Sequence, residues 1–241
     1  INSNANVLPK AGDDVISTIN IDLQDVAERA LINALEKHKA EFGCVAVMEV
    51  KTGKIKAIAN LRRLKEGLFI EDYNYVIGEH SEPGSTFKLA SILAGLEDGF
   101  FKLSDSVDTE NGRCKFFDRT MIDSKKGGYG KITIGEAFVV SSNVGISKVI
   151  NNAYAKQPEK FVDRLYKFQL NTPLNIEIPT PENPKIKTPK SLDWSGTTLP
   201  WMSIGYEVSL TPLHLLTFYN AIANKGRMVK PLFVSGLKRN G

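Results

Sequence analysis

Residues 83–88 are Pro83-Gly84-Ser85-Thr86-Phe87-Lys88, and apolar side chains follow them at helical spacing as far as Gly99. The Pro-Gly pair breaks the chain, so the sequence predicts a helix that begins at Ser85 and ends at Gly99. Because Ser85 and Lys88 are three residues apart, they would share one face of its first turn. This pair is the starting point for both the fold and the function.

The pair predicts nucleophilic chemistry. A serine hydroxyl is a poor nucleophile until a neighbour takes its proton. A lysine in a dry cleft has a lowered pKa, and its neutral amine can act as that base. The positive end of the helix dipole would stabilise an oxyanion formed there. We therefore expect Ser85 to be an acyl-accepting nucleophile and Lys88 to be its base.

Ser-x-x-Lys is too short to be specific, since about one chance match is expected in a chain of this length. Ser235-Gly236-Leu237-Lys238 also fits the pattern, but it lies in a polar tail. Ser85 differs because a helix breaker precedes it and a strong helical pattern follows it. The second match is interpreted as chance.

Ser141-Ser142-Asn143 lies between two predicted helices, Thr133–Val140 and Val144–Ala153. A second serine hydroxyl, that of Ser141, could relay a proton, and the Asn143 amide could bind a peptide carbonyl. The alternative is a polar turn in which Ser142 is the N-cap of the following helix. Taken by itself, the triplet leaves both interpretations open.

The composition is that of a globular protein. The chain has 241 residues, of which 42% are apolar, enough for one large domain or two small ones. Its net charge is +4, but the basic residues are scattered, so no nucleic acid is expected as a partner. Cys44 and Cys114 allow at most one disulfide. No apolar run reaches 18 residues.

No cofactor or metal is expected. The three histidines, His38, His80 and His214, are far apart and form no ligand spacing, and no glycine-rich nucleotide motif occurs.

The remaining segments predict a mixture of strands and helices without regular βαβ alternation, and hence an α+β fold. Residues 1–13 are expected to be a linker and residues 14–241 one domain. The expected elements are a strand at Val15–Ile21, a helix over 22–41 with Asp22 as N-cap, a hairpin of Gly43–Val50 and Lys54–Leu61, a loop over 62–80, loops with short strands over 102–131, a helix at Phe161–Phe168, an extended loop over 173–200, and a helix from Thr211–Pro212 to Gly226.

The two motifs, in this order, resemble the first two active-site motifs of class B penicillin-binding proteins. Other segments are also similar to that family, and Ser142–Lys148 looks like its septal, cell-division branch. The resemblance covers residues from about 14 to 235. The further segments are Ile19–Gln24, Val45–Ala59, Gly205–Tyr206 and Thr211–Asn224.

The resemblance implies a serine β-lactamase/transpeptidase fold, in which helices cover an antiparallel sheet. Ser85 would attack the D-Ala-D-Ala carbonyl of a peptidoglycan stem peptide, with Lys88 as base, Ser141 as proton relay and Asn143 positioning the substrate or the lysine. β-Lactams would acylate Ser85, and divisome proteins would be partners. The site would face the periplasm, anchored to the bacterial inner membrane by a helix outside this chain.

Two features depart from the family pattern. Lys51-Thr52-Gly53 matches the third motif of the family in letters, but it precedes the other two and is interpreted as the hairpin turn. No such triplet follows Asn143, so the domain is expected to be truncated before that motif and the fragment could be inactive. Glu207 also stands where the family commonly has Gly.

Two rival functions remain open. A serine β-lactamase or β-lactam sensor would share the acylation chemistry, although no base for deacylation is identifiable. An inactive scaffold of the division machinery would not need the intact set Ser85, Lys88, Ser141 and Asn143.

Overall fold

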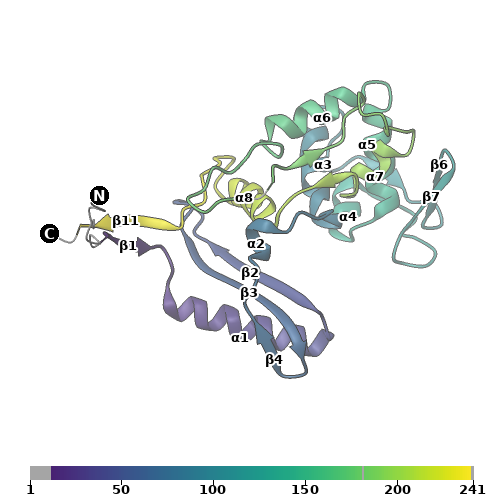
Figure 1. Ribbon diagram of the computed structural model, residues 1–241. Helices are drawn as coiled ribbons and strands as arrows, with labels where there is room; N and C mark the ends of the chain where they lie inside the picture. The colour runs from purple at the N-terminus through teal and green to yellow at the C-terminus, as the bar shows by residue number, and fades with distance from the viewer. Residues whose placement is uncertain (1–11, 181, 240–241) are drawn as a thin grey trace, which may run out of the picture.

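The computed structural model describes residues 12–180 and 182–239. It has the expected α+β fold, in which a small sheet with one covering helix adjoins a larger helical part (Figure 1). Among the described residues, every strand ladder is antiparallel. The predicted linker over residues 1–13 lies outside the described residues, apart from residues 12 and 13.

The sheet consists of β2 (Phe42–Met48), β3 (Ile55–Lys65) and β4 (Leu68–Ile70). The predicted hairpin is confirmed, since β2 and β3 pair directly. Residues 51–53 form the turn between them, with Gly53 at φ +78°. A Cβ on Gly53 would lie 2.1 Å from the Lys230 carbonyl oxygen, so this triplet is fixed as a tight turn.

Helix α1 (Ile21–His38) covers the sheet through buried Ala27, Leu31 and Leu35. Its N-cap is Asn20, not the predicted Asp22. The Asn20 backbone is extended and its side chain accepts a hydrogen bond from the Leu23 N–H at 3.0 Å. Asp22 instead lies in the first turn, where a carboxylate favours the helix dipole.

The predicted first strand is shorter than expected. Strand β1 (Asp14–Ser17) stops before Thr18, because the buried Thr18 hydroxyl turns to the Ile55 and Leu232 carbonyls. β1 pairs with β11 (Val234–Lys238), and the two strands project from the rest of the molecule (Figure 1). The second Ser-x-x-Lys match, Ser235 to Lys238, therefore lies in a strand. Residues three apart in a strand face opposite sides, so these two side chains do not share a face.

The prediction of a loop over residues 62–80 is wrong. β3 continues to Lys65, a turn at Gly67 (φ +72°) leads into β4, and a short helix α2 (Tyr75–Gly78) follows. Local periodicity is weak here because tertiary contacts define the segment, among them the stacking of Phe42 on Tyr75 and an ion pair between Arg62 and Asp72.

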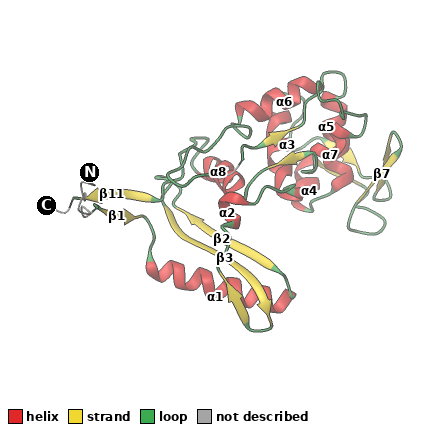
Figure 2. Ribbon diagram, in the orientation of Figure 1, coloured by secondary structure: helices red, strands yellow, loops and turns green. Residues whose placement is uncertain are grey.

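The larger part is helical and holds the main core (Figure 2). The predicted helices are confirmed to within a few residues. They are α3 (Lys88–Glu97), preceded by a 3-10 turn η1 (Gly84–Phe87), α4 (Ile134–Val139), α5 (Asn143–Tyr154), α6 (Pro158–Lys167) and α8 (Pro212–Ala223).

Short elements connect these helices. The expected short strands form two ladders, and the long proline-rich segment is mainly loop, but it also contains a two-residue strand and the start of a helix. The elements are β5 (Ser106–Asp108) with β8 (Lys131–Thr133), β6 (Arg113–Phe116) with β7 (Arg119–Ile122), β9 (Lys185–Ile186) with β10 (Val208–Ser209), and α7 (Thr198–Met202).

Within the described ranges, no cluster of three or more potential metal ligands occurs, and no helix is long and apolar enough to cross a membrane. Cys44 and Cys114 are both free.

We predict a pH-dependent stability that depends on His214. This side chain is 5% exposed on α8, and its Nδ1 lies 2.7 Å from Thr211 Oγ1. Burial, with a contribution from His80, lowers the pKa of His214 to about 4. The unfolded chain binds this proton near pH 6.5, so stability is lost as pH falls from about 6.5 towards 4, by up to about 3 kcal/mol.

Denaturant unfolding between pH 4 and 8 measures this loss. His214→Gln should flatten the slope below pH 6.5, whereas His38→Gln on the exposed face of α1 should not. An unchanged slope in His214→Gln would show that the ring does not control acid stability.

Candidate active site

Ser85 lies in the η1 turn at the start of α3 and is exposed. The turn is held from below by Gly205, whose carbonyl accepts a hydrogen bond from the Gly84 N–H at 3.1 Å. A Cβ on Gly205 would lie 2.0 Å from the Gly84 carbonyl oxygen. Only glycine allows this approach, so Gly205 helps to position the turn that carries Ser85.

Lys88 follows Ser85 by one turn and is buried, with 1% of its surface exposed. Its Nζ lies 2.7 Å from the Ser141 carbonyl oxygen, 3.0 Å from Ser141 Oγ and 2.7 Å from Asn143 Oδ1. Ser141 and Asn143 follow Lys88 by 53 and 55 positions in the chain, and the fold brings both into contact with its amine. The structure brings the predicted Lys88, Ser141 and Asn143 together.

The three oxygens around Nζ differ in what they can do. The Ser141 carbonyl only accepts hydrogen bonds. Asn143 is oriented by its Nδ2, which donates to the Ile122 carbonyl at 2.9 Å, so its Oδ1 faces the lysine as an acceptor. The Ser141 hydroxyl can donate or accept. A neutral amine has two N–H groups for the two fixed acceptors and one lone pair left for a hydroxyl.

The protonation of Lys88 follows from its surroundings. Burial lowers the pKa of Lys88 to about 8, because the charged form loses its hydration, while the negative charge of Asp123 acts in the opposite direction. At neutral to mildly basic pH, a substantial fraction of the amine is therefore unprotonated.

The structure confirms the N-cap interpretation of the second motif, and it also places Ser141 against Lys88. Ser142 is the N-cap of α5, and its Oγ accepts a hydrogen bond from the Gly145 N–H at 2.8 Å. Ser141 has a left-handed backbone, with φ +55°, which is unusual for a residue with a side chain. This conformation presents both its carbonyl and its hydroxyl to Lys88.

Ser85 is placed differently from the other three predicted residues. In the described part of the chain, its hydroxyl makes no hydrogen bond, and the lysine amine is held by Ser141 and Asn143 instead. Ser85 and Lys88 nevertheless share one helical turn, since the Lys88 N–H donates to the Ser85 carbonyl.

Sequence reasoning missed Asp123, which follows β7. Its carboxylate is 5% exposed and accepts hydrogen bonds from Ser142 Oγ at 2.9 and 3.0 Å and from the Val144 N–H at 2.9 Å. A single aspartate in a loop-rich segment carries no spacing signal, so nothing local in the sequence points to it.

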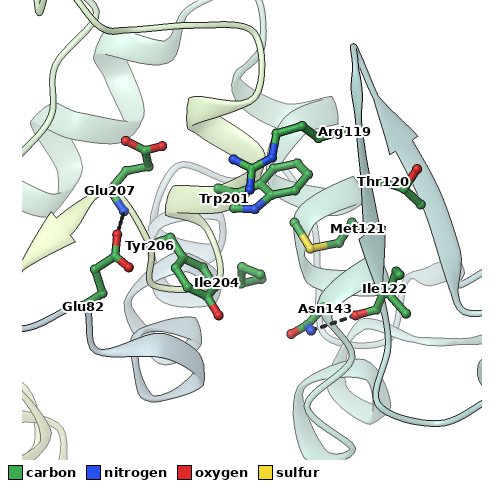
Figure 3. A pocket seen from close by; sticks show the side chains of 10 residues that line it. All are labelled: Glu82, Arg119, Thr120, Met121, Ile122, Asn143, Trp201, Ile204, Tyr206 and Glu207. Atoms are coloured by element: carbon green, nitrogen blue, oxygen red, sulfur yellow. Dashed lines mark hydrogen bonds between the residues drawn. The ribbon is translucent and has the colours of Figure 1, made fainter.

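A cleft of about 650 Å³ opens beside Asn143 (Figure 3). On one side, the Arg119 guanidinium lies 4.5 Å from the centre of the Trp201 ring, and on the other side stand Glu82 and Glu207. The cleft therefore offers apolar, cationic and anionic surfaces. Its other lining residues are Thr120, Met121, Ile122, Ile204 and Tyr206.

Glu207, which departs from the family pattern, now has a structural explanation. Its backbone lies at φ +61°, a region that favours glycine. Its N–H donates to Glu82 Oε1 at 2.9 Å, and its carboxylate forms an ion pair with Lys187. The side chain thus makes a contact that glycine could not make, at the cost of a strained backbone.

Residues 43–239 match the family model described as the penicillin binding protein transpeptidase domain. The chain therefore belongs to the penicillin-binding protein transpeptidase family. It is 30% identical over 226 residues to the probable peptidoglycan D,D-transpeptidase PbpC of Pseudomonas aeruginosa, covering 92% of this chain and 39% of that protein. It is 27% identical over 226 residues to the peptidoglycan D,D-transpeptidase FtsI of Buchnera aphidicola, covering 92% and 38%.

Among solved structures, the apo TP domain of penicillin-binding protein 3 from Burkholderia pseudomallei is similar in fold, with a TM-score of 0.78 at 24% identity, covering 92% of this chain and 62% of that one. These matches confirm the expected α+β transpeptidase fold and the resemblance to septal class B proteins. The chain spans about two fifths of the length of the curated relatives it matches.

The strained backbone at Glu207 can be tested with two variants. Glu207→Gly and Glu207→Ala both remove the ion pair with Lys187, but only glycine relieves the left-handed strain. We expect Glu207→Gly to exceed Glu207→Ala in free energy of unfolding by about 1 kcal/mol. Denaturant unfolding measures the difference, in which the ion pair cancels because both variants lack it. Equal stability of the two variants would contradict the prediction.

Proposed function

We propose that the protein is a peptidoglycan D,D-transpeptidase of the septal, class B type, with Ser85 as nucleophile. The observation that carries this proposal is the buried Lys88 amine, held by Ser141 and Asn143 one helical turn from Ser85. Membership of the transpeptidase family and the presence of a polar cleft beside Asn143 support it.

In the first half-reaction, Ser85 Oγ attacks the carbonyl carbon of the D-Ala-D-Ala bond, and its proton passes to the neutral Lys88 amine. The tetrahedral oxyanion develops at the start of α3, where the Ser85 N–H and the helix dipole would stabilise it. The C–N bond then breaks, and the leaving D-alanine takes a proton from the lysine, with the Ser141 hydroxyl as relay. An ester on Ser85 remains.

In the second half-reaction, an amine of a neighbouring stem peptide attacks this ester. Lys88 accepts the proton of the attacking amine, the C–O bond breaks, and Ser85 regains its hydrogen. The products are a cross-link between two stems and the free enzyme. Asn143 holds the lysine through Oδ1, while the cleft between Arg119 and Glu82 would receive the stem peptide.

The wider setting is part of the same proposal. We assign residues 14–241 to the transpeptidase domain, since the strand β1 at its start pairs with β11 near its end. The protein would act at the periplasmic face of the inner membrane, bind β-lactams and work with divisome proteins, as the similarity to FtsI suggests.

Labelling with a fluorescent penicillin tests the nucleophile. The full-length protein should form a stable, covalently labelled species, because the strained lactam carbonyl takes the place of D-Ala-D-Ala and the acyl group stays on the serine. Ser85→Ala should abolish the label, whereas Ser235→Ala, which alters the chance match, should leave it unchanged. An unlabelled wild-type protein would favour the inactive scaffold, and turnover of the penicillin within seconds would favour a β-lactamase.

The pH dependence of acylation tests the base. Because the pKa of Lys88 is lowered to about 8, the free amine increases with pH, and the labelling rate should rise up to about pH 8 and then level off. Lys88→Arg keeps the charge but cannot act as a base, so its rate should fall by about 100-fold or more. Lys148→Arg, on the α5 surface beside Glu110, is the matched control and should keep the wild-type profile. A flat profile from pH 6 to 9 would contradict the assignment of Lys88.

A further inference from the structure

Lys88 and Asp123 are an isolated pair of buried charges. Within the described residues, Lys88 and Asp123 are the only Lys, Arg, Asp or Glu residues that are buried as a whole, at 1% and 5% exposed. The Asp98 side chain is 3% exposed, but it is paired with Arg164. An unpaired buried charge is strongly destabilising, so each of these groups needs compensation from its surroundings. The two are not in direct contact, because no ion pair joins them and the Ser141–Asn143 turn lies between.

The side-chain hydrogen bonds of Asp123 are with this turn and with the first turn of α5. Its two carboxylate oxygens accept from Ser142 Oγ, and Oδ1 also accepts from the Val144 N–H. The carboxylate thus completes the N-terminus of α5, where a negative charge favours the helix dipole. The preceding residue, Ile122, holds Asn143 through its carbonyl at 2.9 Å.

The turn passes this constraint on to the lysine. Ser142 is fixed on the Asp123 side, and its two neighbours, Ser141 and Asn143, supply the three oxygens around Lys88 Nζ. A shift of the turn would therefore move every hydrogen-bond partner of the amine at once.

We infer that Asp123 is a positioning residue for the proposed acylation: it anchors the Ser141–Asn143 turn on Lys88 and supplies the buried negative charge that this lysine faces. The inference rests on the proposed function only where it predicts the rate of acylation. The charge of Asp123 and its contacts with the turn belong to the protein without substrate. Asp123 touches no reacting atom.

Several other charged groups on the elements around α3 have partners of their own. They are Glu136 on α4 with Thr133, Lys148 on α5 with Glu110, Arg164 on α6 with Asp98 at the end of α3, Lys160 on α6 over the Phe100 ring, Lys125 over the Tyr129 ring near α4, Arg119 on β7 over Trp201, and Glu207 after α7 with Lys187. Glu82, before η1, accepts from the Glu207 N–H. None of these groups perturbs Lys88 as Asp123 does.

The sign of the expected effect is fixed by electrostatics. Asp123 stabilises the protonated lysine and so raises the pKa of Lys88 against the lowering effect of burial. Asp123→Asn removes the charge but keeps an oxygen that can accept from the Val144 N–H. Its lysine should therefore lose its proton at lower pH, by about one unit. Asp123→Ala leaves the Ser142 hydroxyl and the Val144 N–H without a buried partner, so the turn itself should loosen.

The experiment titrates Lys88 in the full-length protein by NMR of ¹³Cε-labelled lysine, with Lys88→Met for assignment, and measures fluorescent penicillin labelling over the same pH range. In Asp123→Asn, both the Lys88 titration and the acid limb of labelling should move down by about one pH unit. In Asp123→Ala, labelling should fall about tenfold or more at every pH. Asp98→Asn is the control. It removes a poorly exposed carboxylate at the end of α3, about 15 Å along the helix from Lys88, and should leave the Lys88 titration unchanged.

A Lys88 titration that stays at the wild-type position in Asp123→Asn overturns the inference, whether or not the protein is labelled. A wild-type protein that is not labelled, but whose Lys88 titration does move in Asp123→Asn, removes the proposed function and leaves the pairing of the two charges intact. If Asp123→Ala does not fold, the Asp123→Asn titration still decides.

Discussion

The structure of the site depends on one constraint: an amine with no access to water must find all its hydrogen-bond partners in the protein. For Lys88, those partners are three oxygens on Ser141 and Asn143. Because two of them can only accept and the third can also donate, the amine is satisfied both with and without its extra proton. A lysine in such surroundings can exchange a proton with a hydroxyl without rearrangement of its neighbours.

Several unusual features of the backbone serve this constraint. Ser141 adopts a left-handed conformation that brings its carbonyl and its hydroxyl to the same atom. Gly205 lets the Ser85 turn lie against the α7–β10 connection, closer than any side chain would permit. Strain of this kind persists where the surrounding structure over-determines it, and here the cap of α5 and the core beneath α3 provide that support.

The sequence predicted the parts of this arrangement that depend on local patterns. The helix after Pro83–Gly84, the hairpin turn at Lys51–Gly53 and the two helices around Ser141–Asn143 follow from periodicity and turn chemistry. The loop predicted over residues 62–80 was wrong because α2 is held by contacts with distant residues such as Phe42, and β4 by its pairing with the extension of β3. Asp123 was missed for a related reason: it acts on residues 19 and 21 positions away, and only the fold brings them together.

The central claim is that Lys88 can rest as a neutral amine beside the Ser141 hydroxyl, one helical turn from Ser85. Neutron diffraction from deuterated crystals grown above about pH 8.5 would count the deuterons on Nζ directly. The predicted result is two deuterons, directed at the Ser141 carbonyl and at Asn143 Oδ1, with the lone pair facing the Ser141 hydroxyl. Three deuterons on Nζ at that pH would mean that the lysine remains a cation, and the account of Ser85 activation would be wrong.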